Sequence, residues 1–169
     1  MRRIVFLSLM VACAILLQIM ESFFPVFGFI PGFKIGFANL VSLLVLRLWG
    51  LRSMWIVSLT RILLASLMMG TIFSVPFWLS LAGGICSLVA MSLASKCRCF
   101  SIYGISILGA CFHSIGQVLV ITFLYQQYFM QLFLPILLAL SNVSGLINAY
   151  IAQLVCHRLE KGRIQYGKI

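Results

Sequence analysis

The sequence predicts an all-α integral membrane protein with six transmembrane helices in one bundle. Hydrophobic residues make up 63% of the 169 residues and charged residues 8%, far less charge than a soluble domain carries. Apolar segments of about 20 residues, long enough to cross a bilayer as a helix, recur along the chain. The basic residues lie in short clusters between these segments, a pattern that sets the orientation of membrane proteins.

The predicted spans follow one another with short links. Gly50, Gly70 and the region of Pro76 mark breaks, because glycine and proline interrupt helices. The spans form one transmembrane domain, residues 1–157, which is followed by a short basic tail, residues 158–169. The predicted spans are Ile4–Phe24, Ile35–Trp49, Met54–Met69, Ile72–Ala94, Ile102–Tyr125 and Leu132–Cys156.

The charge distribution predicts the topology. Four basic clusters fall on one side of a six-span chain, and the positive-inside rule makes that side cytoplasmic, with both termini inside. The links at 70–76 and 125–131 carry no charge and face outward. The expected location is the plasma membrane of a bacterium. The four clusters are Arg2 and Arg3; Arg47 and Arg52; Lys96 and Arg98; and Arg158, Lys161, Arg163 and Lys168.

Two basic residues depart from this distribution: Lys34, on the outer side, and Arg61, inside the third span. An ionised group within a bilayer normally faces the bundle interior or a cavity, because its burial in lipid is costly. Arg61 is therefore a candidate for ligand binding, and the alternative is a side chain that reaches toward lipid phosphates. The net charge of +10 does not indicate a nucleic-acid partner, since the basic residues form no single stripe.

Neutral polar residues within the spans are the other candidates for ligand binding. His113 and Gln117 lie four residues apart on one face of the fifth span, which fits either a polar cavity or hydrogen-bonded packing. Asn142 lies near mid-depth in the sixth span and is a predicted ligand-binding residue. Asn148 lies among small residues, Ser144 and Gly145 included, and this composition favours close helix packing with amide cross-links.

The scarcity of acidic residues argues against catalysis. The chain contains Glu21, Glu160 and no aspartate, so it lacks the clustered carboxylates that hold Mg²⁺ in enzymes acting on diphosphates. It has no phosphate-binding G-x-x-x-x-G-K-[ST] motif for ATP. The six cysteines show no metal-ligand spacing, and Cys97 and Cys99 are expected to be free thiols in a reducing cytoplasm. We therefore expect no enzyme activity, no catalytic residue, no cofactor and no metal.

Four stretches carry a resemblance to a known family: "PGFKIGFANLVSLLVLRLWG", "RILLASLMMGTIFS", "LSLAGGICSLVAM" and "SILGACFHSIGQVLV". Together they cover most of residues 31–121 and resemble the Gx transporter family, also called heptaprenyl diphosphate synthase component I. That family is in turn similar to the substrate-binding S components of energy-coupling-factor (ECF) vitamin transporters. Those components are six-helix proteins that capture a ligand near the outer face. A separate coupling protein and two ATPases supply the energy.

The resemblance implies a binding cavity beneath the link between the first two spans. Lys34 and Asn39 would line its outer part, while the alternative for Lys34 is a pair with Glu21 or with lipid head groups. It also implies docking of a coupling protein through small residues of the first span, for which Ser8 and Ala12 are candidates.

The polar residues of the spans predict a small anionic, quinone-like or vitamin-like ligand, because their donors and positive charges face one acid, Glu21. Two other roles stay open: a non-catalytic accessory or carrier in isoprenoid and quinone metabolism, and a purely structural membrane subunit.

Overall fold

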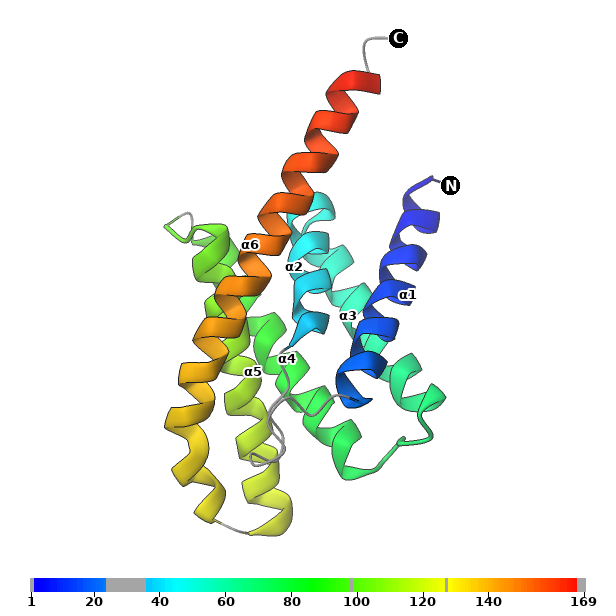
Figure 1. Ribbon diagram of the computed structural model, residues 1–169. Coiled ribbons are helices and arrows are strands. Elements are labelled where there is room, and N and C mark those ends of the chain that lie inside the picture. The colour runs from blue at the N-terminus through cyan, green and yellow to red at the C-terminus, as the bar shows by residue number, and fades with distance from the viewer. Residues whose placement is uncertain (1, 24–35, 98, 127, 167–169) are drawn as a thin grey trace.

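The described part of the chain is helical almost throughout. The computed structural model describes residues 2–23, 36–97, 99–126 and 128–166, and no strand occurs among them (Figure 1). The predicted all-α fold is confirmed. The helices are α1 (Arg2–Phe23), α2 (Phe37–Trp49), α3 (Leu51–Met68), α4 (Val75–Lys96), α5 (Ile102–Tyr125), the short 3-10 helix η1 (Tyr128–Phe133) and α6 (Leu134–Tyr166).

Local sequence signals set several helix ends. Gly50 has a φ of 83°, which favours glycine, and it both ends α2 and precedes α3. Ser74 precedes α4, whose first turn contains Pro76, a position that proline tolerates well. Ser101 caps α5, because its side chain accepts a hydrogen bond from the Gly104 backbone N–H at 3.4 Å. These short connections make successive helices run in opposite directions.

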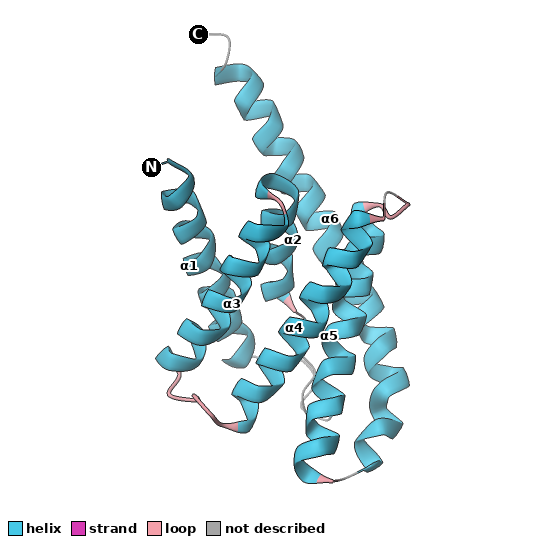
Figure 2. Ribbon diagram, turned by 180° about the vertical axis from the view of Figure 1, so that it is seen from behind, coloured by secondary structure: helices cyan, strands magenta, loops and turns pink. Residues whose placement is uncertain are grey.

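The two chain ends lie at the same end of the bundle (Figures 1 and 2). The connection at Gly50 and the one between α4 and α5 lie at this end too, whereas the connections from α3 to α4 and from α5 to α6 lie at the opposite end. The helix ends that meet here carry the basic residues, so we call it the basic end. They are Arg2 and Arg3 of α1, Arg47 of α2, Arg52 of α3, Lys96 of α4 and Arg158 of α6.

The protein is a multi-pass membrane protein. Within the described ranges, α1, α3, α4, α5 and α6 are long and apolar enough to cross a bilayer. Large apolar side chains such as Ile4, Phe123 and Leu132 are exposed, as lipid contact requires. The predicted second span is the exception in length. With 13 residues, α2 is about 20 Å long, whereas the hydrocarbon core is about 30 Å thick.

α2 is the central helix of the bundle. It contacts α1, α3, α5 and α6, and the six consecutive residues Leu40 to Val45 are all buried. A helix that is apolar on nearly all sides is buried in protein or in lipid, and α2 is buried in protein. The hydroxyls of Ser42 in α2 and Ser58 in α3 are 2.7 Å apart and supply one polar link in this core. Other buried core residues are Ala14, Met54, Val57, Leu88, Met91, Ala152 and Cys156.

Glycine and serine residues bring α4, α5 and α6 close together. A Cβ atom on Gly116 of α5 would lie 2.9 Å from the carbonyl oxygen of Ala82 and 3.0 Å from the Cα of Gly83, both in α4. A Cβ on Gly145 of α6 would lie 2.9 Å from the Cα of Ile107 in α5. Such close backbone contact is typical of membrane helices packed through small residues.

Candidate functional site

A small polar cavity lies inside the bundle at the N-terminal end of α2. Its volume is about 20 Å³, and α1, α3, α4 and α5 contribute side chains to it. Three residues predicted to bind a ligand lie together here, namely Asn39, Arg61 and His113. The lining residues are Gln18, Glu21, Gly36, Asn39, Arg61, Ile62, Ser80 and His113.

The start of α2 is fixed by contacts with two other helices. Gly36 has a φ of 78° and is buried, and its backbone N–H donates a hydrogen bond to Oε1 of Glu21 in α1. Its carbonyl oxygen accepts hydrogen bonds from the Asn39 backbone N–H at 2.8 Å and from Nδ2 of Asn148 in α6 at 3.2 Å. The N-terminus of α2, with its partial positive charge, is therefore anchored inside the protein beside the cavity.

Arg61 is the central cation of this cavity. It is the eleventh residue of α3, about 15 Å along the helix from Leu51, and 3% of it is exposed. Among the residues that the structure describes, its Nε and Nη1 atoms have no hydrogen-bond partner. Glu21 attracts it electrostatically and lines the same cavity. The interpretation of Arg61 as a side chain that reaches lipid phosphates does not fit this position, because it points into the bundle.

His113 and Gln117 approach the cavity from α5 across a glycine of α4. A Cβ atom on Gly83 would lie 2.9 Å from Cε1 of His113, 2.9 Å from the His113 carbonyl oxygen and 3.0 Å from Cγ of Gln117. Gly83 thus allows the two helices to approach closely. His113 lines the cavity, whereas Gln117 is buried next to the same contact one helical turn further on.

Three of the predicted residues are not among those that line the cavity: Gln117, Lys34 and Asn142. Lys34 lies outside the described residues, and so does its predicted pairing with Glu21. Asn142 is exposed, and its Oδ1 atom accepts a hydrogen bond from Cys111 Sγ at 3.2 Å. Asn148 is the asparagine of α6 that reaches the cluster, with 1% exposed. Asn148 lies six positions after Asn142, which corresponds to a rotation of about 240° around the helix axis, so the two side chains lie on different faces of the helix.

Sequence reasoning missed Gln18 and Ser80, which line the cavity, and Asn148, which does not line it but donates a hydrogen bond to the carbonyl of Gly36. Gln18 lies three residues before Glu21, so the pair shares one face of α1, and this spacing was an available signal. Ser80 carries no such signal, because serine is common in membrane helices. Asn148 was assigned to helix packing, and its bond to Gly36 fits that role as well as it fits support of the cavity.

The cluster is suited to binding an acceptor-rich group. Its donors are the Arg61 guanidinium, the Asn39 amide and the His113 ring, against one carboxylate, which already accepts from Gly36. Within the described ranges, no three His, Cys, Asp or Glu side chains lie close enough to hold a metal ion. The arrangement can hold and orient an anion or a polarised carbonyl.

Comparison with known proteins gives one result. No curated protein and no solved structure matches the chain. The sequence pattern of the family described as heptaprenyl diphosphate synthase component I matches residues 10–155, which include every described residue of the polar cavity. The chain therefore belongs to the heptaprenyl diphosphate synthase component I family.

Proposed function

We propose that the chain is a substrate-binding membrane subunit of a transporter, similar in role to an ECF S component. Its ligand is a small molecule with a carboxylate, a phosphate or a quinone-like carbonyl, bound beside Arg61. The observation that carries this proposal is the pair of buried Arg61 nitrogens, Nε and Nη1, without a hydrogen-bond partner among the described residues.

Electrostatics support an anionic or acceptor-rich ligand. An unsatisfied buried donor costs about 1–3 kcal/mol, and a charged one costs more. A ligand oxygen placed at Arg61 removes that cost, and the planar guanidinium can bind a carboxylate or phosphate through two hydrogen bonds. The N-terminus of α2 lies beside the same cavity and favours negative charge there.

The size of the cavity implies movement. A volume of about 20 Å³ is close to what one water molecule fills. A vitamin-sized ligand therefore requires the surrounding helices to separate before it reaches Arg61. The proposed subunit thus captures its ligand by opening, and not by filling a preformed pocket.

Energy for transport comes, in this proposal, from a separate coupling protein and ATPases. The sequence has no ATP-binding motif of its own. Ser8 and Ala12 lie on an exposed face of α1, which leaves this pair accessible to a partner helix. We infer that the basic end faces the cytoplasm of a bacterial plasma membrane, because basic residues accumulate on that side of membrane proteins.

A second candidate function rests on the family's description. That description names a component of heptaprenyl diphosphate synthase, and it favours an accessory or carrier role in isoprenoid metabolism. A catalytic role is not part of either proposal, since the polar cavity contains one carboxylate and Mg²⁺-dependent prenyl transfer needs several. The two candidates differ in whether a purified chain carries a small polar ligand or a prenyl diphosphate.

The test is mass spectrometry of small molecules that co-purify with the chain in mild detergent. Arg61→Gln is expected to make the free energy of ligand binding less favourable by about 2–5 kcal/mol, the scale for losing one partner of a buried charged contact. Arg61→Lys should restore part of the binding, because the charge returns without the planar fork. Leu64→Ala, on the same helix and 40% exposed, is the control. Full ligand occupancy in a folded Arg61→Gln protein would show that the site lies elsewhere.

A further inference from the structure

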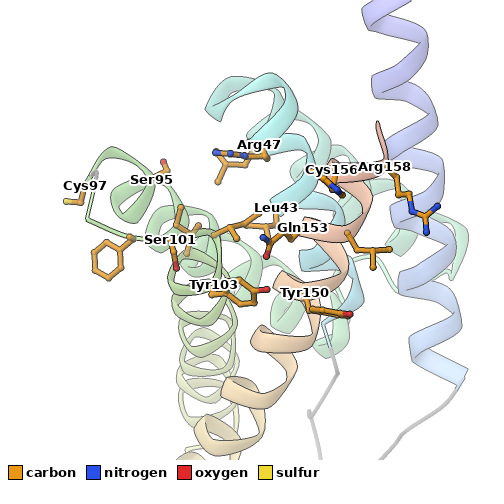
Figure 3. A pocket seen from close by; sticks show the side chains of 16 residues that line it. Leu43, Arg47, Ser95, Cys97, Ser101, Tyr103, Tyr150, Gln153, Cys156 and Arg158 are labelled. Carbon is orange, nitrogen blue, oxygen red and sulfur yellow. The ribbon is translucent and has the colours of Figure 1, made fainter. Parts of the chain in front are cut away.

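A second and much larger cavity lies at the basic end of the bundle. It is a groove of about 1220 Å³ between the last turns of α2, the connection from α4 to α5, and the middle of α6 (Figure 3). This volume exceeds that of most small-molecule sites, which measure about 300–1,000 Å³. The groove does not include Arg61, His113 or any other residue that lines the polar cavity.

The groove is amphipathic. Leu43 and Leu46 of α2, Ile105 of α5 and Leu154 of α6 give it an apolar wall. Polar groups stand at one part of it: Figure 3 shows Tyr103 of α5 and Gln153 of α6 reaching toward one another, with Arg47 of α2 above them.

Its charge is positive. Arg47 and Arg158 line the groove, and no lining residue is acidic. Both arginines are exposed, so an occupant of the groove can reach them. An occupant with complementary charge is therefore anionic.

The position of the groove favours a lipid. Arg47 lies in the last turn of α2, and Ser101 and Tyr103 lie at the start of α5, so the polar part is at the depth of the head groups. Tyr150 and Leu154 line the groove and are 62% and 49% exposed, so it also opens sideways toward the hydrocarbon. A molecule that enters from the bilayer can place its phosphate at Arg47 and an acyl chain along the leucines.

We propose that this groove is a binding site for an anionic phospholipid from the leaflet at the basic end. The phosphate lies between Arg47 and the Tyr103 hydroxyl, with Gln153 as a further donor, and one acyl chain lies against Leu46 and Leu154. The site is separate from the ligand site at Arg61, so either proposal can fail without the other.

Native mass spectrometry of the purified full chain tests the proposal, with added phosphatidylglycerol or phosphatidylcholine of matched acyl chains. The wild type should bind phosphatidylglycerol more tightly, and the preference should fall as ionic strength rises. Arg47→Gln should weaken phosphatidylglycerol binding about tenfold, equivalent to about 1.4 kcal/mol. Arg52→Gln is the matched control, an exposed arginine at the same end that does not line the groove, and should change binding less than about twofold.

Three outcomes would overturn the proposal. Equal binding of the two lipids by the wild type would show that the groove does not select anions. Equal losses in Arg47→Gln and Arg52→Gln would assign the preference to the diffuse charge of the whole end. Displacement of the lipid by millimolar glycerol phosphate would show a site for a soluble phosphate. Arg47→Lys, which keeps the charge, should retain the lipid preference. If Arg47→Gln does not fold, equal binding of the two lipids by the wild type, or displacement by glycerol phosphate, would still overturn the proposal.

Discussion

A pair of neighbouring glycines in α4 offers a sharp test of how α4 meets α5. Gly83 and Gly84 are both buried, and they differ in what an added methyl group would contact. At Gly83 a Cβ atom would lie 2.9 Å from the carbonyl oxygen of His113, a backbone atom, and equally close to the His113 ring. At Gly84 it would lie 2.6 Å from Cδ1 of Ile62, the far end of a flexible side chain. The same substitution therefore meets a rigid obstacle at one position and a movable one at the next.

The expected magnitudes follow from two opposing effects. Alanine is favoured over glycine in a helix by about 1 kcal/mol. Overpacking against atoms that cannot move costs about 1–3 kcal/mol. Gly83→Ala should therefore lower the free energy of unfolding by up to about 2 kcal/mol. Gly84→Ala should leave it unchanged or raise it by up to about 1 kcal/mol, since Ile62 can rotate away.

The assay is unfolding of the two purified variants in mixed detergent micelles by added SDS. The loss of the helical circular dichroism signal reports the free energy of unfolding. Ligand retention gives a second readout for Gly83→Ala, because the added methyl group displaces His113 at the polar cavity. Gly84→Ala contacts a different residue of the cavity lining, the flexible side chain of Ile62. A Gly83→Ala protein as stable as Gly84→Ala would contradict the close contact between α4 and α5 described above.

Three further predictions follow. Cys97 and Cys99 are both exposed at the basic end, so they should not react with an impermeant thiol reagent in intact cells but should react in inside-out vesicles. Rapid labelling in intact cells would show that the basic end faces outward. Asn148→Ala should lower the free energy of unfolding by about 1–3 kcal/mol in the same denaturation assay, because it removes the hydrogen bond to the Gly36 carbonyl. Asn142 is exposed, so Asn142→Ala should lower it by less than about 0.5 kcal/mol. The purified chain with Mg²⁺ should not elongate radiolabelled prenyl diphosphates, and sustained turnover by this chain alone would contradict both proposed functions.

The sequence located the helices well, because long apolar runs bounded by charge, glycine or proline are strong signals in a membrane protein. The predicted fifth span, Ile102–Tyr125, coincides with α5. The sixth was predicted to end at Cys156, whereas α6 continues to Tyr166. Hydropathy marks where a chain leaves the bilayer, but a helix continues into water as long as no residue breaks it. The predicted tail is therefore partly a continuation of α6.

Helix faces were harder to predict than helix positions. In a soluble protein an apolar stripe identifies the buried face, but in a membrane the lipid-facing and protein-facing sides are both apolar. We therefore predicted Asn142 as a ligand-binding residue although it is exposed, and left out Asn148, which is buried. Nothing in the sequence indicated that α2 lies at the centre. Arg61 was predictable as an inward-facing residue, because its charge is too costly in lipid.

The packing of the bundle indicates which side would open for a ligand. α4, α5 and α6 meet through backbone contacts at Gly116 and Gly145, and membrane helices this close are difficult to separate because both contacts would be lost. α1 differs in two ways. Of its apolar segment Ile4–Glu21, 22% is buried, and the helix contacts α2 and α3. It also carries Glu21, which holds the start of α2 through the Gly36 N–H and attracts Arg61. An anion bound at Arg61 competes with Glu21 for that guanidinium, so on the function proposed here a bound ligand would weaken the attachment of α1 and keep the bundle open on that side.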